Sequence, residues 1–244
     1  MLVTLATRTF TPEPTAAALR LGALARALAA GGDRVRVLTS RLAPSVARDA
    51  HESGENDERT EESHGLVNVR RAPVLRDRTG AVRGYVSYMS FDLPLLARLL
   101  TGPRPDVVVS EPPPTTGAAV RIACAARRVP YVYYCADIVS DAAALAGVPS
   151  IVVRTVAGLE SFALRGARRV IAVSDGVARR ARDLGARDVA VVPNGVRVPD
   201  AVATGTPEGF PTCDGPVFVY AGTVAQWLAP EVFVDAFERA RARL

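Results

Sequence analysis

A carboxylate stands where one of the most apolar runs of the sequence ends. The run "PYVYYCAD" covers residues 130–137 and closes on Asp137. If the run is a buried strand, Asp137 emerges at its carboxyl end, where open parallel sheets bind their ligands. An aspartate in that place could accept a hydrogen bond from a hydroxyl or take up a proton. The structural alternative is that Asp137 caps the following helix, because aspartate is also a preferred N-cap residue.

The turns after two other apolar runs hold further polar candidates. After the first run, Thr15 is a plausible helix cap, and Arg20 could either reach a phosphate or extend to solvent. After "DVVVS", Glu111 leads through three prolines to Thr115 and Thr116 at a helix start. The amides of a helix N-terminus favour anions, so these residues are candidate substrate contacts.

The turn "PNGV" follows the last run of this series. Its glycine, Gly195, can adopt a positive φ, and together with Asn194 it leads straight into a segment of different composition. We interpret the turn as a hinge between two domains and include both residues among the candidate substrate contacts.

Apolar runs alternate with helical patterns along most of the sequence. Near-continuous apolar strands separated by helices are typical of a parallel sheet covered on both faces, so the predicted fold class is α/β, with a Rossmann-like, doubly wound parallel sheet. The expected strands are 2–7, 34–39, 66–72, 106–111, 130–137, 168–174 and 188–193, and the expected helices include 15–30, 84–100, 116–128 and 175–184.

Composition divides the chain into a complete domain, a linker and a further unit. Residues 1–198 form the predicted domain, 199–215 are rich in Gly, Pro and Thr, and 216–244 predict a strand, a turn and a helix. We expect this last unit to be the incomplete start of a second α/β domain. Within the first domain, residues 49–65 carry seven acidic side chains and predict a mobile surface loop, in which His51 and His64 are more readily solvated than metal-bound.

The overall composition limits the classes of partner and site. The net charge is +5, but every basic side chain is an arginine, and no basic stripe interleaved with aromatics suggests nucleic-acid binding. The three cysteines are far apart and outside any zinc pattern, which favours a reducing compartment. Neither a signal peptide nor a long apolar stretch is present, so we expect a cytoplasmic protein.

Five segments together resemble the family 4 glycosyltransferases of GT-B architecture. They are "TFTPEPTAAALRLGALARALAAGGDRVRVLT", "DVVVSEPPP", "ESFALRGARRVIAVSDGVARRARDLGA", "VAVVPNGV" and "VFVYAGTVAQWLAPEVFVDAF". The resemblance implies two Rossmann-like domains, the first for the acceptor and the second for most of a nucleotide-sugar donor. It further implies transfer from a UDP- or GDP-sugar with retention of configuration, without cofactor or essential metal. The acceptor would be a small or lipid-linked molecule.

The resemblance also assigns roles to individual positions. Thr15 and Ala16 match the loop that approaches the donor diphosphate, although the usual Gly-Gly is missing there. Asp137 matches a region of catalytic or acceptor-side polar residues, while Gly222 and Thr223 match the first turn of the second domain. The paired glutamates of that domain lie beyond residue 244, so we expect this chain alone to be inactive.

Three further expectations remain open at this level. A nucleotide-sugar epimerase of the same architecture is the alternative enzyme, and a non-catalytic acceptor-binding half with a partner chain is the alternative outside enzymes. If the acceptor is lipid-linked, exposed arginines could also provide peripheral contact with the inner face of a membrane. The candidates for that basic face are Arg20, Arg26, Arg165, Arg168, Arg169, Arg179, Arg180 and Arg182.

Overall fold

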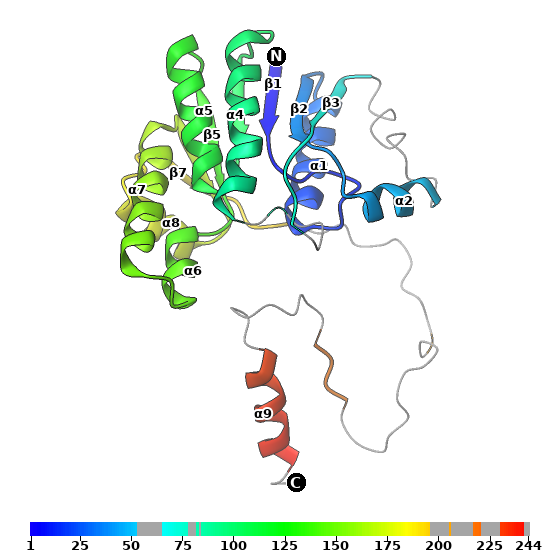
Figure 1. Cartoon of the computed structure of the whole chain (residues 1–244), viewed down its shortest axis with the longest axis vertical. Helices are drawn as coiled ribbons and strands as arrows, with labels where there is room; N and C mark the ends of the chain where they lie inside the picture. The colour runs from blue at the N-terminus through cyan, green and yellow to red at the C-terminus, as the bar shows by residue number, and fades with distance from the viewer. Residues whose placement is uncertain are drawn as a thin grey trace.

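A seven-stranded parallel sheet forms the centre of the molecule (Figure 1). The computed structural model describes residues 1–52, 65–77, 82, 84–195, 205, 217–220 and 230–241. The strand order is β3-β2-β1-β4-β5-β6-β7. Successive strands are added toward one edge of the sheet up to β3 and toward the other edge from β4 onward, so the order of winding reverses between β1 and β4. The strands are β1 (Leu2–Ala6), β2 (Arg34–Ser40), β3 (Val67–Ala72), β4 (Val107–Ser110), β5 (Tyr131–Cys135), β6 (Arg169–Ala172) and β7 (Val189–Val191).

Helices cover both faces of this sheet, as the alternating pattern predicts. On one face α4, α5 and α7 lie side by side, and α1 packs on the other face against β2 and β3. The helices are α1 (Ala16–Ala30), α2 (Pro44–Glu52), α4 (Tyr85–Thr101), α5 (Pro114–Arg127), α6 (Val139–Leu145), α7 (Ser150–Gly166), α8 (Asp175–Asp183) and α9 (Pro230–Arg241). The predicted Rossmann-like, doubly wound fold is therefore confirmed.

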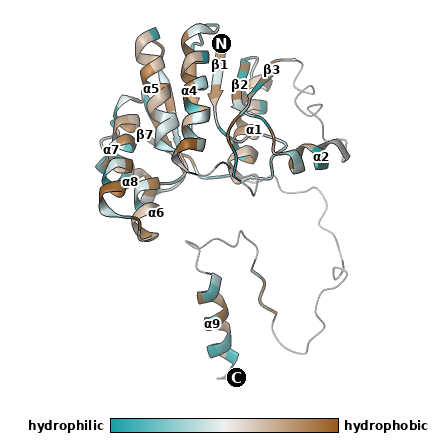
Figure 2. Cartoon of the chain, in the orientation of Figure 1, coloured by the Kyte–Doolittle hydropathy of each residue, from teal (hydrophilic) through white to brown (hydrophobic). Residues whose placement is uncertain are grey.

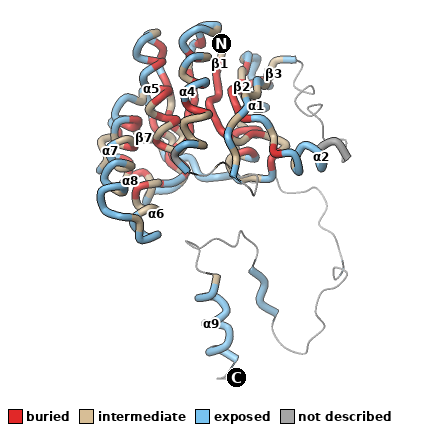
Figure 3. Tube along the Cα trace, viewed as in Figure 1, coloured by how far each residue is buried: buried red, intermediate tan, exposed pale blue. Residues whose placement is uncertain are grey.

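The core consists of two layers, one on each face of the sheet. Leu95, Val120 and Leu164 from three neighbouring helices pack on one face, and Leu21 of α1 packs on the other. Figure 3 shows the buried residues concentrated along the strands and on the inner sides of the helices. This core fixes the strand ends, and with them the turns that carry the polar candidates.

Strands β2 and β3 depart from the predicted apolar runs, because their side chains alternate in character. Val35 and Val37 belong to the apolar layer under α1, while Arg34 and Arg36 point to the opposite face. Arg36 pairs in register with Asn68, which has the same orientation on β3. Successive side chains of a strand point to opposite faces, so one face at this edge of the sheet is polar.

Two segments near predicted boundaries differ from the expectation. Residues 49–52 belong to helix α2, so the first part of the expected acidic loop is helical, and 53–64 lie outside the described residues. Residues 217–220 are not assigned as a strand, because they pair with no described strand.

Helix α9 forms as predicted, with Phe218 and Phe237 in edge contact at 5.7 Å between ring centroids. Its apolar residues alternate with polar ones along the helix (Figure 2), and Val232 and Phe233 are exposed. Most of the expected linker lies outside the described residues.

Candidate active site

A cavity of about 650 Å³ opens at the carboxyl ends of the central strands. The residues after β1, β4 and β5 form its walls, together with the start of α1. Four predicted candidates, Thr15, Arg20, Glu111 and Asp137, line this one cavity. The turn after β1 and the end of β5 thus meet, as expected for parallel strands whose carboxyl ends share an edge.

Asp137 stands at the cavity wall with an exposed side chain. It does not cap the next helix: Ile138 is the N-cap residue of α6 and provides no side-chain bond. Instead, the buried carboxylate of Glu160, from α7, accepts hydrogen bonds from the amides of Val139 and Ser140 at 2.8 and 3.2 Å. A distant glutamate therefore performs the capping function that is the alternative role for Asp137.

Glu111 is the most electrostatically perturbed carboxyl group in the cavity. Burial raises its pKa to about 7, against the opposing effects of a hydrogen bond with Thr7 and the charges of Arg20 and Arg8. The negative charge of Asp137 raises this pKa further, so the two carboxyl groups are close enough to interact. A carboxyl group that titrates near neutral pH is suited to proton transfer.

Glu111→Gln is expected to make the protein more stable at neutral and alkaline pH, because the variant has no carboxyl group that must lose a proton inside the folded protein. Because the folded-state pKa of Glu111 lies near 7 and its ordinary value is 4.5, the folded protein binds this proton more tightly than the unfolded chain. Stability contributed by the proton is present below pH 4.5 and is lost as the pH rises to about 7. At about 1.4 kcal/mol per pKa unit, the variant should exceed the parent by up to about 3 kcal/mol at pH 8 and match it near pH 4.5.

Urea unfolding of both proteins at the two pH values measures this difference. Glu238→Gln is the matched control, because it removes the same charge from an exposed position on α9. An equal free energy of unfolding for Glu111→Gln and the parent at pH 8 would contradict the raised pKa.

Arg8 organises a buried polar network beside the cavity. Its Nη2 atom donates to the hydroxyls of Thr115 and Thr116 at 3.0 and 3.2 Å and lies 3.4 Å from Asp92 Oδ2. Thr116 also donates to Asp92 Oδ1 at 2.6 Å, and the guanidinium of Arg8 lies over the ring of Tyr88 at 3.8 Å. Of this network, Arg8 and Tyr88 line the cavity, whereas Thr115 and Thr116 contact Arg8 and are not among the lining residues.

The α1 side of the cavity combines a helix start with a half-buried arginine. Thr15 is the N-cap of α1, as predicted, and its hydroxyl accepts from the amide of Ala18 at 3.1 Å. Ala16 is exposed and is not among the lining residues. Arg20 places its guanidinium 5.8 Å from the ring centroid of Tyr134, and its buried Nε has no hydrogen-bond partner among the described residues.

The remaining predicted contacts lie apart from this cavity or outside the described residues. Asn194 accepts a hydrogen bond from Tyr134 at 3.3 Å, and it links the "PNGV" turn to β5. Gly195 is exposed, and its φ lies outside the left-handed region, so the turn does not use the positive φ that a glycine allows. Gly222 and Thr223 lie outside the described residues.

Sequence reasoning missed three residues that shape the site. Arg8 directly follows the first apolar run, so the search for polar residues after strands could have found it. Asp92 is hidden in the apolar pattern of α4, and only its contacts with Arg8 and Thr116 reveal it. Glu160 lies in the segment "LESFALRG" of α7, where nothing in the local sequence indicates that its partners belong to α6.

Part of the predicted basic face is neutralised by neighbouring groups. Arg180 forms a bidentate pair with Asp141 at 2.8 to 3.1 Å, and Arg169 pairs with Asp188 at 2.9 Å. Among the described residues, no helix is both long and apolar enough to cross a membrane. In the same part of the chain, no group of three His, Cys, Asp or Glu side chains could hold a metal ion.

Several solved structures have a similar fold, and the match covers about half of each of them. A sucrose-phosphate synthase from Thermosynechococcus elongatus matches with a TM-score of 0.56 and 15% identity, over 80% of this chain and 48% of that one. UGT89C1 from Arabidopsis thaliana matches with a TM-score of 0.51 and 12% identity, over 84% and 52% of the two chains. Its complex with UDP-L-rhamnose matches with a TM-score of 0.50 and 12% identity, over 82% and 53%.

These likenesses concern the fold, because the identities are low and the chain spans about half the length of the structures it matches. No curated protein matches the sequence. A family model described as "Glycosyl transferase 4-like domain" matches residues 15–195, which include most of the sheet and most of the residues that line the cavity. The predicted resemblance is thereby confirmed, and the chain belongs to the glycosyl transferase 4-like domain family.

Proposed function

We propose that this chain is the acceptor-side domain of a glycosyltransferase that moves a sugar from a UDP- or GDP-sugar to an acceptor with retention of configuration. The observation that carries the proposal is the cavity at the carboxyl edge. There, Asp137 is exposed and does not cap a helix, and it faces the same space as the N-terminus of α1. Family membership supports the reaction class, and structures of similar fold that bind UDP-sugars support the donor class.

Asp137 is the proposed catalytic residue. Its carboxylate can accept a hydrogen bond from an acceptor hydroxyl or from the transferred sugar, because no helix amide occupies it. As the acceptor oxygen bonds to the anomeric carbon, the bond from that carbon to the diphosphate breaks, the diphosphate leaves with the electron pair, and the hydroxyl proton passes to the carboxylate of Asp137. Glu111, with a pKa near 7, is a second group able to exchange a proton in the same cavity.

The α1 side of the cavity is the proposed diphosphate contact. The main-chain amides of Ala16 and Ala17 and the guanidinium of Arg20 provide positive charge there. Such groups can stabilise a leaving diphosphate without a metal ion. Four further residues stay predicted contacts on the side of the second domain: Asn194, Gly195, Gly222 and Thr223. In this proposal Thr115 and Thr116 act through Arg8, because their hydroxyls accept its hydrogen bonds.

The test compares the 244-residue chain with a version that carries a complete second domain. Both are incubated with UDP- and GDP-sugars and a panel of small and lipid-linked acceptors. We expect product only from the longer version, with the donor's anomeric configuration, because the proposed donor-binding domain is represented among the described residues only by 217–220 and helix α9. EDTA should leave the rate unchanged. Turnover by the short chain, inverted product or loss of activity with EDTA would each contradict the corresponding part of the proposal.

A nucleotide-sugar epimerase is the second candidate, favoured by the interacting carboxyl groups of Glu111 and Asp137. The same incubation without acceptor separates the two, because an epimerase would convert the donor sugar and release no transfer product. Glu13, a third carboxylate at the cavity, accepts from the amide of Phe10 at 3.1 Å and therefore has a structural role.

Peripheral contact with a membrane is a further part of the proposal if the acceptor is lipid-linked. Exposed arginines such as Arg179 can each contribute up to about 1 kcal/mol at an anionic surface. Co-sedimentation with anionic vesicles should then decrease with salt, and binding that salt does not change would argue against it.

A further inference from the structure

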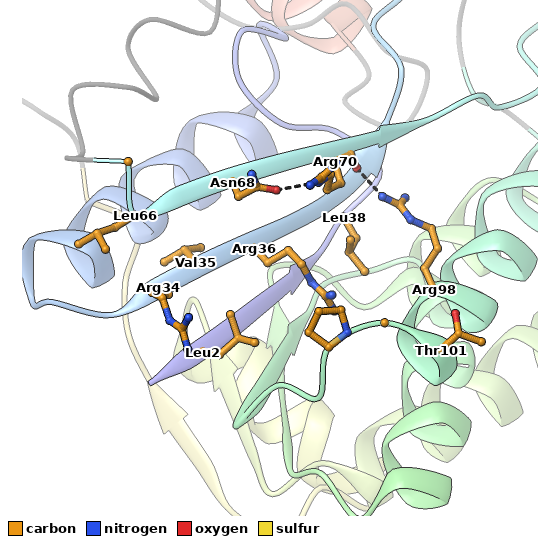
Figure 4. Close-up of a pocket in the computed structure, with 13 residues that line it drawn as sticks. Leu2, Arg34, Val35, Arg36, Leu38, Leu66, Asn68, Arg70, Arg98 and Thr101 are labelled. Carbon is orange, nitrogen blue, oxygen red and sulfur yellow. Dashed lines mark hydrogen bonds between the residues drawn. The ribbon is translucent and has the colours of Figure 1, made fainter.

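A second cavity of about 610 Å³ lies on the polar face of β2 and β3, toward the amino ends of the strands. Arg36 stands at its centre, Arg70 projects from β3, and Arg98 reaches across from the C-terminal part of α4 (Figure 4). This cavity shares no lining residue with the one that contains Asp137. The proposed sugar transfer assigns no role to this cavity or to its arginines.

Arg36 is held in place without partners for two of its guanidinium nitrogens. Its Nε and Nη2 atoms are both buried and lack any hydrogen-bond acceptor among the described residues. The group also lies tightly against the end of α4, since a Cβ on Gly102 would be 2.9 Å from Arg36 Nη1. Unsatisfied buried donors of a charged group are costly, so an acceptor at this point would stabilise the arrangement.

Neighbouring positive charges increase the free-energy cost of burying the guanidinium of Arg36. Burial lowers the pKa of Arg36, and the positive charges of Arg98, Arg127 and Arg70 lower it further. In the part of the chain that the structure describes, no carboxylate forms an ion pair with Arg36, Arg70 or Arg98. Like charges are thus gathered with no compensating anion from these residues.

The end of α4 explains some of these arginines, but it leaves Arg36 unpaired. A helix C-terminus carries negative partial charge and attracts cations, worth about 0.3–1 kcal/mol. Arg127 uses that site, donating to the carbonyls of Leu99 and Gly102 at 2.7 and 2.8 Å. Arg98 donates to the carbonyl of Arg70 at 3.0 Å. Within the described ranges, the buried Nε and Nη2 atoms of Arg36 make no such bond with a carbonyl of α4.

We propose that Arg36, Arg70 and Arg98 form a binding site for the phosphate group of a soluble small molecule, separate from the sugar-transfer cavity. Guanidinium groups bind phosphate oxygens in a bidentate, charge-assisted manner, and a phosphate provides enough acceptors for several of them. The volume lies within the usual range for small-molecule pockets. Apolar side chains, including Leu2, Leu38 and Leu66, provide surface for the remainder of such a molecule.

Inorganic pyrophosphate is the probe, and isothermal titration calorimetry of the whole chain measures its binding. Arg36→Gln is expected to raise the dissociation constant at least tenfold at low salt. The variant should also melt at the same temperature as the parent or higher without pyrophosphate, because the substitution removes an unpaired charge that its neighbours repel. If Arg36→Gln does not fold, Arg98→Gln tests the same site from the helix side and should weaken binding as well.

Two control variants separate binding at this site from binding elsewhere on the protein. Arg154→Gln removes one exposed charge of α7 and should leave the affinity unchanged. Arg20→Gln reports separately on the proposed diphosphate contact in the cavity of Asp137, because pyrophosphate bound there should be lost in Arg20→Gln and kept in Arg36→Gln. A result that contradicts the phosphate site can therefore be told apart from a result that contradicts the proposed transferase function.

Each outcome of the titration either supports or overturns the proposed phosphate site. No pyrophosphate binding at millimolar concentrations overturns the proposal, as does equal weakening in Arg154→Gln and Arg36→Gln, or weakening in Arg20→Gln alone. Saturable binding that is lost only in the Arg36 or Arg98 variant supports it. Vesicles containing about a third of anionic phospholipid distinguish the source of the phosphate: pyrophosphate binding with no vesicle binding indicates a soluble ligand. Arg36-dependent binding to vesicles alone overturns that source.

Discussion

Asp137→Asn is expected to reduce sugar transfer at least about 100-fold in a protein that carries the complete second domain, with no change in melting temperature. The amide keeps the size of the side chain and can still accept a hydrogen bond, but it cannot take a proton or hold a negative charge. Glu160 occupies the amides at the start of α6, so the carboxylate of Asp137 has no capping role to lose. Turnover and thermal unfolding measured on the same preparation test both halves of this expectation.

A charge-matched control comes from the same edge of the sheet. Asp175 is exposed at the start of α8, and Asp175→Asn should leave the turnover within a factor of about two of the parent, because the residue does not line the cavity. Unchanged turnover in Asp137→Asn would make that carboxylate dispensable and would transfer the catalytic assignment to Glu111. A large fall in melting temperature would instead indicate a structural role.

Arg8→Met is expected to lower the free energy of unfolding by about 3–5 kcal/mol. Methionine fills much of the volume, but it leaves Asp92 buried without its cation. Thr115 and Thr116 also lose the donor that both hydroxyls share. The cost is mainly the desolvated charge of Asp92, rather than the attraction of the pair, and urea unfolding at neutral pH measures it.

A double variant separates this charge effect from lost packing. Adding Asp92→Asn to Arg8→Met removes the uncompensated charge and should recover a substantial part of the loss, because Thr116 can still donate to the amide oxygen. Strictly additive costs for the two substitutions would show that Arg8 and Asp92 do not interact energetically. Arg154→Met, at an exposed position, is the control for loss of an arginine.

The sequence predicts the order and the type of the elements in the sheet well, because buried parallel strands and their covering helices leave strong local patterns. The "VIAVSDGV" segment is an example: Ser174 caps α8, and its hydroxyl accepts from the amide of Val177. Boundaries that depend on packing were less predictable. Helix α2 continues through residue 52 into the acidic segment, and 217–220 do not form a strand without a sheet to pair with.

The candidate site was predictable in position and incomplete in composition. Searching the turns after parallel strands finds Thr15, Glu111 and Asp137, because topology alone brings these turns to one edge. The same search cannot find Asp92, which lies inside a helix, or decide between capping and catalysis for Asp137. The contacts of Glu160, which lies 20 and 21 residues along the chain from its partners, exclude the capping role, and catalysis by Asp137 stays a prediction.

The contact between Glu160 and the start of α6 has a consequence for the order in which the domain folds. A cap provided by a neighbouring residue can form as soon as its helix does, but this cap exists only after α7 has docked. Helix α6, with seven residues, is too short to persist alone. The wall that holds Asp137 should therefore be assembled late in folding, and it should open whenever α7 detaches. In native-state hydrogen exchange, the amides of Val139 and Ser140 should exchange together with those of α7, as one cooperative unit.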